Sequence, residues 1–500
     1  MRPSIAKKIP LIQPKALLSD LIELRSAVLA EGKQQMDKWQ LDIREDRQNF
    51  QCSATNLASY LALRQRDLRD LQATLRSWGL SSLGRIEAQV LQNLDAVIVT
   101  LTQLCGEHPD KYVSRQHLES FLQGQRFLEQ ETELVFGKTP LNRRVRMMVT
   151  LAKETANDQE LVRQMVTSGM NIARINCAHD TSEDWLKMVV NVRRAEQKTG
   201  MPCKVSMDLG GPKSRTGKVV IPSGKRIKVG CIILLTTATP KYSKKYPFQV
   251  QCLLPEAIIQ VHAGAQVWFD DGKIGTVVNE RVSKGLILMV TQTSDGGENL
   301  KSDKGINFPD TALTLDALTE KDLRDLDFIV KYADIINYSF VQTSDDICAI
   351  QREIAARNPQ RDIALIIKIE TAKAIENLPD LIVAAGSRQP LGVMIARGDL
   401  AVEIGFERMA EMQEEILWIC EAANVPVIWA TQVLETLAKT GRPTRAEMTD
   451  AAMAERAECV MLNKGKYIIE AMRILDSVLV RMQSHQSKKS AQLRALRSWL

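Results

Sequence analysis

The sequence lacks any apolar run long enough to cross a membrane. Its longest apolar stretches, such as CIILL at 231–235, fall far short of the about 20 residues that a spanning helix needs. No apolar signal-peptide core stands near the start. We therefore expect a cytoplasmic protein without membrane contact, although the acid-free basic start leaves an organelle transit peptide open as an alternative.

Cysteine pairs and an excess of one charge sign are missing as well. The nine cysteines are scattered singly with no CxxC, which argues against disulfides and indicates reduced thiols. The 66 basic and 60 acidic residues are mostly interspersed and give a net charge of +6. This balance suits a protein that handles small anions and argues against a nucleic-acid partner. Only the ends are one-sided, and we expect 483–500 to be a solvated basic C-terminal tail.

What is present begins with a helical texture. The first 135 residues are rich in Leu, Gln, Arg, Ala and Glu with apolar positions spaced by three and four, as in LASYLALRQRDLRDLQATLRSW at 57–78. We predict an N-terminal helical domain over 1–135. The connector FGKTPLNRR at 136–144 ends it, because Gly, Pro and Asn interrupt the apolar period.

Short apolar runs, each followed by a polar or Gly cluster and then a helical pattern, dominate the remainder. Eight such runs occur, at 147–151, 171–177, 203–209, 334–340, 364–370, 392–399, 426–432 and 459–465. Strands alternating with helices indicate parallel β/α units, and eight of them predict a closed barrel. The fold class is thus α/β, a (β/α)8 TIM barrel.

One interval, between the third and fourth runs, is too long for a single helix. Residues 217–303 read as short alternating strands with turns, and we predict a small β-barrel domain inserted there. The barrel domain would then comprise 144–216 and 304–482. Without the insert roughly 230 residues remain, close to the about 250 typical of such barrels.

Polar side chains stand at the C-terminal ends of the predicted strands. They are Arg174, Asn176, Asp208, Ser339, Lys368, Glu370, Arg397, Asp399, Thr431 and Gln432. In a barrel these ends converge on one face, where such proteins place their sites. Glu370 and Asp399, from neighbouring strands, are suited to hold a divalent cation; the alternative is that they only pair with Lys368 and Arg397. Lys368 shares a strand face with Glu370 because side chains alternate with a period of two.

A series of segments in this half of the chain resembles the pyruvate kinase family. In chain order they read GMNIARINCAHD, MDLGGPKSRTG, FDDGKIG, KGINFPD, LTEKDLRDL, IIKIE, MIARGDLAVEIGFE and ATQVLETL with GRPTRAE. The resemblance covers about Arg144 to Leu479. It implies a barrel with a lid-like β domain and phosphoryl transfer between phosphoenolpyruvate and ADP, giving pyruvate and ATP.

The resemblance also implies roles for individual residues. Glu370 and Asp399 would be ligands of Mg²⁺ (or Mn²⁺), Lys368 would stabilise the phosphoryl group in transit, and Arg174 would bind its oxygens. The backbone after Gly398 would receive the substrate carboxylate at a helix N-terminus, and Thr431 would lie by the carbon that is protonated. Nucleotide-side positions are Asn176, His179, Arg215 and Lys304.

Several positions depart from the family pattern. Ala178 replaces a serine of the family's potassium site, and Lys213 replaces the glutamate of Gly-Pro-Glu. Because a tethered ammonium can supply the charge of a bound potassium ion, we predict that K⁺ is not required; the alternative is that Lys213 is merely solvated. In the eighth strand the altered segment includes Asn463 and Lys464: the family reads Met-Leu-Ser-Gly-Glu-Thr, so Asn463 replaces a hydroxyl, Lys464 a glycine and Gly465 an acid on the side where the proton is donated.

The domain set differs too, and so the functional alternatives stay open. We expect the family's regulatory C-terminal domain to be missing, while the N-terminal helical domain is extra and could pack on the barrel, form a homo-oligomer or recruit a partner. The leading interpretation is a divergent, magnesium-dependent pyruvate kinase. The alternatives are a barrel enzyme for another enolpyruvate or oxoacid substrate, and a catalytically weak sensor of phosphoenolpyruvate or nucleotide.

Overall fold

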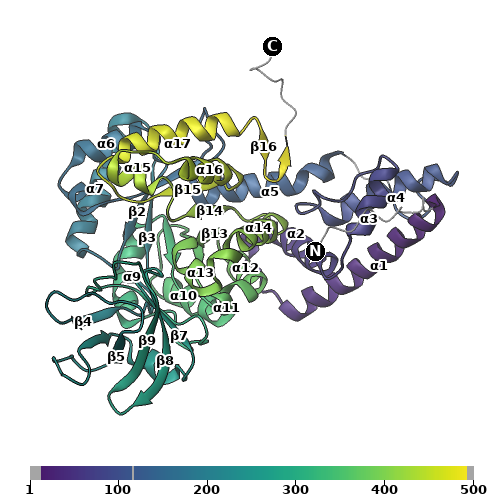
Figure 1. The fold of residues 1–500 in the computed structure, drawn as a ribbon. Helices are drawn as coiled ribbons and strands as arrows, with labels where there is room; N and C mark the ends of the chain where they lie inside the picture. Colours follow the sequence, from purple (N-terminus) through teal and green to yellow (C-terminus); the bar gives the residue numbers. More distant parts are fainter. Residues whose placement is uncertain (1–12, 115–117, 492–500) are drawn as a thin grey trace.

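Eight parallel strands form a closed barrel at the centre of the molecule. The computed structural model describes residues 13–114 and 118–491 (Figure 1). The barrel strands are β1 (Arg146–Thr150), β2 (Ile172–Asn176), β3 (Lys204–Asp208), β11 (Ile335–Tyr338), β12 (Ala364–Ile369), β13 (Leu391–Ala396), β14 (Val427–Ala430) and β15 (Cys459–Leu462), and β15 pairs back onto β1. Almost every strand residue is buried, because helices cover the outer face of a parallel sheet. The predicted α/β barrel is confirmed.

Helices follow the barrel strands, and four of them begin at a capping box. The helices are α6 (Gln159–Thr167), α7 (Ser182–Thr199), α9 (Glu320–Tyr332), α10 (Ser344–Ala356), α11 (Ala372–Glu376), α12 (Leu378–Gly386), α13 (Arg397–Ile404), α14 (Phe406–Ala422), α15 (Glu435–Thr440), α16 (Arg445–Met453) and α17 (Ile468–Met482). Thr181, Thr319, Thr343 and Thr444 each form a capping box with the acid three residues on. These reciprocal bonds satisfy free N–H groups and so fix where each helix starts.

A second, mixed sheet lies between β3 and β11 and forms a separate lobe in Figure 1. It contains β4 (Thr216–Val220), β5 (Ile232–Thr236), β6 (Phe248–Cys252), β7 (Gln266–Phe269), β8 (Ile274–Val282), β9 (Gly285–Gln292) and β10 (Ile306–Asn307), with the short helix α8 (Pro255–Gln260) after β6. An antiparallel bridge between Arg215 and Gly305 joins its two edges, so the sheet curls back on itself. Its hydrophobic core is distinct from the core of the barrel.

The N-terminal region is helical, as the sequence predicts. Its helices are α1 (Pro14–Trp39), α2 (Phe50–Arg64), α3 (Arg69–Ser77), α4 (Val90–Leu104) and α5 (Leu118–Phe136). In Figure 1, α1, α3 and α4 project to one side, whereas α5 runs back to the barrel. On α2, the ring of Phe50 lies so close to Gly386 that an added Cβ there would come within 2.4 Å of it. The helices therefore pack on the barrel, one of the three roles that the sequence left open.

The last turn of α5 closes the N-terminal end of the barrel. Val135 and Phe136 are buried among inward-facing residues of the strands, including Met148, Ile172 and Ile366. Packed side chains of this kind fill the interior of a (β/α)8 barrel, so here the helical region supplies part of that core.

The described part of the expected solvated tail is anchored instead. β16 (Gln486–Ser487) and β17 (Ser490–Ala491) form a hairpin whose turn places Lys488 on Glu458 and Lys489 on Glu87. Residues 492–500 of that tail, and residues 1–12 of the predicted helical domain, lie outside the described residues. Within the described chain, no helix combines the length and the apolarity that crossing a bilayer requires.

Candidate active site

Four charged side chains meet inside the C-terminal end of the barrel. Arg174 donates from Nε and Nη2 to the two carboxylate oxygens of Asp208, at 3.0 and 2.6 Å. Lys368 Nζ lies 2.9 Å from Glu370 Oε1 and 3.6 Å from Asp208 Oδ2. All four are buried. The predicted convergence of Arg174, Lys368 and Glu370 is therefore present in the structure.

Strand alternation explains why these side chains point inward. Ile172 and Ile366 belong to the apolar layer above Phe136, and Arg174 and Lys368 follow two residues later on the same strands. A period of two keeps each pair on one face, so a charged layer succeeds the apolar one. Thr150 continues the column of β1 in the same way and accepts from Arg174 Nη1 at 2.9 Å.

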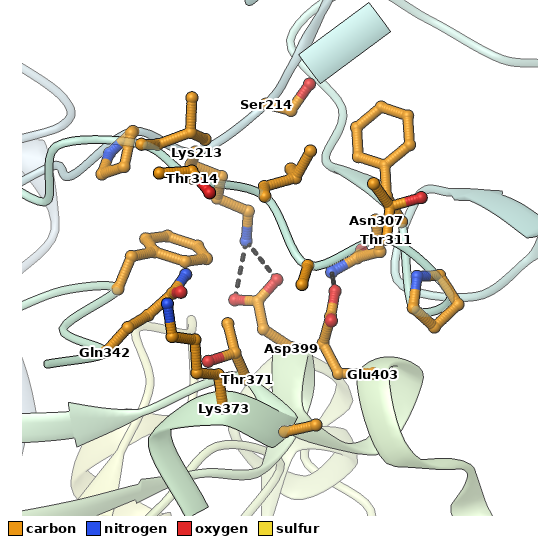
Figure 2. A pocket seen from close by; sticks show the side chains of 18 of the residues that line it. Lys213, Ser214, Asn307, Thr311, Thr314, Gln342, Thr371, Lys373, Asp399 and Glu403 are labelled. Carbon is orange, nitrogen blue, oxygen red and sulfur yellow. Dashed lines mark hydrogen bonds and ion pairs between the residues drawn. The ribbon is translucent and has the colours of Figure 1, made fainter. Parts of the chain in front are cut away.

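Asp399 joins this face from the first turn of α13. Lys213 Nζ lies 2.8 Å from both of its carboxylate oxygens, as Figure 2 shows. Burial alone would raise the pKa of the Asp399 carboxyl, but nearby Lys213 and Lys368 hold that pKa below its usual value. Lys213 is thus an ion-pair partner, and the alternative of a merely solvated side chain is wrong.

The sequence left open that Glu370 only pairs with Lys368 and Asp399 only with Arg397. The first of these pairs is present in the structure and the second is not. Glu370 does pair with Lys368, but Arg397 turns away from Asp399. Arg397 binds Asp450 of α16 at 2.8 Å and donates to the backbone oxygens of Ala430 and Thr431, at 2.8 and 2.5 Å. Arg397 therefore braces the end of β14.

The cluster is balanced in charge. Three cations, Arg174, Lys368 and Lys213, face three carboxylates, Asp208, Glu370 and Asp399. Burial would raise the pKa of Asp208, whereas Arg174 and Lys368 lower it, with lowering as the net result. Because buried charges need partners, an anion can enter this cluster at low cost only together with further positive charge.

The donor set fits a divalent cation. Glu370 is a buried carboxylate and Asp399 a partly buried one, both with hard oxygen atoms, and Phe340 N orients Glu370 by donating to Oε2 at 2.7 Å. In residues 13–114 and 118–491, no group of three or more His, Cys, Asp or Glu side chains is placed to hold a metal ion. A cation held by this pair would keep other coordination positions for substrate oxygens and water.

Thr431 lies in strained backbone at the end of β14. Its φ is +64°, and Gln432 and Leu434 also have positive φ values. The buried Oγ1 of Thr431 has no hydrogen-bond partner among the described residues. Gly398 faces it, since a Cβ added there would lie 3.9 Å from that oxygen. Strain and an unpaired buried hydroxyl together are typical of functional positions.

The expected nucleotide-side residues lie around the mouth of the barrel. Asn176 Oδ1 accepts from Ala178 N at 3.1 Å and shapes the loop after β2. Arg215 and Lys304 pair with Asp303 and Asp270, at 3.3 and 3.0 Å.

His179 shows that positive charge gathers on this side. Burial, and then the nearby Arg215 and Lys464, lower the pKa of its imidazole. From the sequence, Lys464 is recognised only as a departure from the family pattern; in the structure it lies near enough to His179 to lower the pKa of that imidazole.

A cavity of about 570 Å³ opens beside Asp399, between α13 and the segment that returns from the inserted sheet. Figure 2 shows Asn307 and Glu403 side by side there, with Asn307 Nδ2 donating to Glu403 Oε1 at 3.1 Å. Burial raises the pKa of the Glu403 carboxyl to about 7. The sequence analysis did not identify Glu403, and it did not identify Asp208 as the residue that holds Arg174. Asp208 lies two residues after Ser206, which is level with the inward-facing Arg174 on the neighbouring strand, so the alternation of side chains along β3 could have placed Asp208 inside the barrel.

A (β/α)8 barrel with cations and carboxylates gathered at the C-terminal ends of its strands defines a class of barrel proteins with a charged site at that face. Comparison with known proteins narrows the class. The family described as "Pyruvate kinase, barrel domain" matches residues 142–472. The chain belongs to the pyruvate kinase family.

Individual relatives agree with this assignment. The pyruvate kinase of Geobacillus stearothermophilus is 32% identical over 355 residues, which is 69% of this chain and 57% of that protein. Human pyruvate kinase PKLR is 31% identical over 397 residues, which is 76% of this chain and 67% of that protein. The pyruvate kinase of Dictyostelium discoideum is 32% identical over 345 residues, which is 67% of this chain and 65% of that protein. The chain thus spans about three fifths to two thirds of the length of these relatives.

Proposed function

We propose that this protein is a magnesium-dependent phosphotransferase that moves a phosphoryl group from phosphoenolpyruvate to ADP, giving pyruvate and ATP. The observation that carries the proposal is the set of Arg174, Lys368, Glu370 and Asp399 on one face of the barrel, of which the first three are buried and Asp399 is partly buried. Phosphoryl transfer depends mostly on positioning and charge neutralisation, and this set offers both. The similarity to pyruvate kinases supports the same reaction.

Arg174 and Lys368 are placed to hold the phosphoryl group. Asp208 fixes the Arg174 guanidinium in a bidentate pair, and Thr150 takes a third N–H, so two of its five N–H groups are left for phosphoryl oxygens. Ser339 Oγ and Glu370 fix the Lys368 ammonium, at 2.7 and 2.9 Å. Such preorganised cations stabilise charge that develops in the transition state. A divalent cation, Mg²⁺ or Mn²⁺, held by Glu370 and Asp399 would neutralise further phosphoryl charge.

The start of α13 and Thr431 would deal with the remainder of the substrate. No side chain caps the N-terminus of α13, so the free N–H groups after Gly398 can receive a carboxylate. The Thr431 hydroxyl has no partner in the described structure and would face the carbon that takes a proton as the enolate becomes pyruvate.

His179, Arg215 and Lys304, with Asn176 shaping the loop, would bind the nucleotide. Lys464 adds positive charge on the His179 side.

We further propose that Lys213 makes the activity independent of potassium. Ala178 offers no hydroxyl ligand for a monovalent cation, and the Lys213 ammonium is already tethered within the cluster. A fixed ammonium can supply the positive charge for which a bound potassium ion would otherwise be needed.

A coupled assay for pyruvate, with magnesium and with or without potassium, tests both parts. We expect equal turnover under the two conditions, and a large loss in Lys213→Gln that added potassium partly restores. As a matched control, Lys373→Gln changes another lysine that lines the same cavity and should leave the potassium response unchanged. An absolute requirement for potassium in the unmodified protein would refute the role of Lys213. Absence of pyruvate in both conditions would refute the kinase proposal.

A second candidate is a sensor of phosphoenolpyruvate or nucleotide with weak turnover. The altered segment Asn463–Gly465, in which Asn463 stands where the family has a hydroxyl and Gly465 where it has an acid, favours it, because the loss of a proton-donating group can cost several powers of ten in rate. Ligand binding without pyruvate formation would select this candidate. Turnover of a different enolpyruvate or oxoacid would select the remaining enzyme alternative. A cytoplasmic location and a homo-oligomeric state stay predictions.

A further inference from the structure

Both chain crossings between the barrel and the inserted sheet contact the same short helix. Lys213, on the outgoing crossing, pairs with Asp399 of α13. Asn307, on the returning strand β10, donates to Glu403 of α13. Asp399 and Glu403 are four residues apart and therefore lie on one face of the helix, where Figure 2 shows the two contacts next to each other.

A turn of the inserted sheet approaches the end of α13 as well. Gly272, between β7 and β8, has a φ of +87°, and an added Cβ would lie 3.5 Å from Val402 Cγ2 and from the ring of Phe406. The turn thus lies against the junction of α13 and α14. Outgoing crossing, returning crossing and turn all meet the barrel on or beside α13.

The inserted sheet does not share its hydrophobic core with the barrel. Burial of apolar side chains therefore stabilises each part on its own. Two parts with separate cores and two single-chain crossings move relative to each other by default. The polar contacts to α13 are therefore well placed to influence the orientation of the sheet.

We propose that the Asn307–Glu403 hydrogen bond is a latch that fixes the inserted sheet over the C-terminal face of the barrel. It makes Asn307 and Glu403 positioning residues for the phosphoryl transfer proposed above, on which the kinetic part of this inference rests. The bond is well suited to this role because Asn307 is buried, which removes competition from water. Glu403 is also outside the proposed metal and phosphoryl contacts, so the latch can be cut while those contacts remain.

The proposed nucleotide site makes a kinetic prediction. Arg215 and Lys304 flank the bridge at the base of the sheet, so a loosened sheet would present them poorly. Glu403→Met, which removes the acceptor, should raise KM for ADP about three- to tenfold, the range expected for one lost hydrogen bond. KM for phosphoenolpyruvate should change less than about twofold. Glu403→Gln keeps an acceptor oxygen and should restore the unmodified values.

Hydrogen exchange gives a readout that needs no turnover. Amides in 270–273 and 304–310 should exchange about three- to tenfold faster in Glu403→Met and at the original rate in Glu403→Gln. Asn307→Ala should also speed exchange. The double variant should show less than the sum of the two effects, because both changes cut the Asn307–Glu403 bond, although Asn307 also interacts with Asp399 and Glu403 with the backbone of Phe308. Glu376→Met is the matched control: it alters another glutamate that lines the cavity and should leave exchange unchanged.

The outcomes separate the latch from the proposed reaction. Faster exchange without any pyruvate kinase activity in the unmodified protein would keep the latch and overturn the function. Unchanged exchange in Glu403→Met, with the melting temperature preserved, would overturn the latch. Additive effects of the two single variants would overturn it too.

Discussion

The two ends of the barrel both bury charged side chains, but they use them differently. At the N-terminal end, Arg47 forms two bonds to Glu131, at 2.9 and 2.8 Å, and donates to Gly386 O at 3.1 Å. Glu131 in turn accepts from Leu391 N at 2.8 Å. At the C-terminal end the charged groups are held mostly by one another, as in the Arg174–Asp208, Lys368–Glu370 and Lys213–Asp399 pairs, so a ligand can replace a partner there.

Backbone strain separates the two ends in the same way. Positive φ values occur at Phe340, Thr431, Gln432 and Leu434, all just beyond the C-terminal ends of strands. Beside the N-terminal end of β14, Asn424 also has a positive φ, but asparagine tolerates this conformation. The strained backbone thus lies at the C-terminal end of the barrel, where a ligand can bind. At the N-terminal end, backbone groups such as Gly386 O and Leu391 N are hydrogen-bonded by charged side chains, which stabilises the fold.

The comparison is tested most severely by Lys368→Met. We expect turnover to fall at least about 10³-fold, because the variant removes a preorganised cation, while the protein stays folded despite the loss of stability that an unpaired Glu370 brings. A coupled pyruvate assay and circular dichroism measure the two quantities. Lys204→Met provides the matched control, since Lys204 stands at the opposite end of the barrel and donates to Leu134 O. If both variants lost turnover equally, the two ends would not differ as described.

Arg47→Met probes the other end. It leaves Glu131 buried without its cation, which should lower the free energy of unfolding by about 3–5 kcal/mol. Turnover per folded molecule should be unchanged. Urea denaturation followed by fluorescence gives the stability. Adding Glu131→Leu should recover part of the loss, and a failure to recover would show that Arg47 stabilises by packing rather than by charge.

The carboxyl group of Glu421, near the N-terminal end of the barrel, should make the stability of the protein depend on pH. Burial raises the pKa of its carboxyl from 4.5 to about 7; Glu87 and Glu458 also raise it, while Lys488 and Lys489 oppose them. Since the folded state binds the proton more tightly, stability should fall as pH rises from about 4.5 to about 7 and then level off, by up to about 3 kcal/mol. Urea midpoints at pH 5 and 8 should differ less in Glu421→Gln. An equal slope in both proteins would contradict the assignment.

Thr319→Ala should have the smallest effect, about 1 kcal/mol of stability, because it removes the side-chain cap of α9. The partner in this capping box, Asp322, also accepts from Gly210 N at 2.8 Å, on the loop that carries Lys213. Thermal unfolding should show the loss, and Thr319→Ser should restore it. A change in turnover beyond about twofold would mean that the cap also orders this loop.

The barrel and part of its site could be predicted from local patterns. The eight apolar runs are visible because buried parallel strands need continuous apolar sequence, and the alternation of two places Lys368 with Glu370. The partners of Lys213 and Arg397 could not be predicted in this way. Lys213 and Asp399 are 186 positions apart, and Asp450 comes from a different helix than Arg397, so both pairings depend on how whole elements pack. The same holds for Phe136, whose place inside the barrel has no local signal.

The ion pair between Lys489 and Glu87 joins positions 402 residues apart. During synthesis Glu87 leaves the ribosome long before Lys489 does. Likewise, Phe136 at the end of α5 leaves the ribosome before the barrel strands that enclose its side chain. The helical region must therefore wait, partly unsatisfied, until the barrel has been made. Proteins of this size expose such surfaces transiently and are prone to aggregate in that interval. We therefore expect the helical region to need protection by chaperones until the barrel is complete.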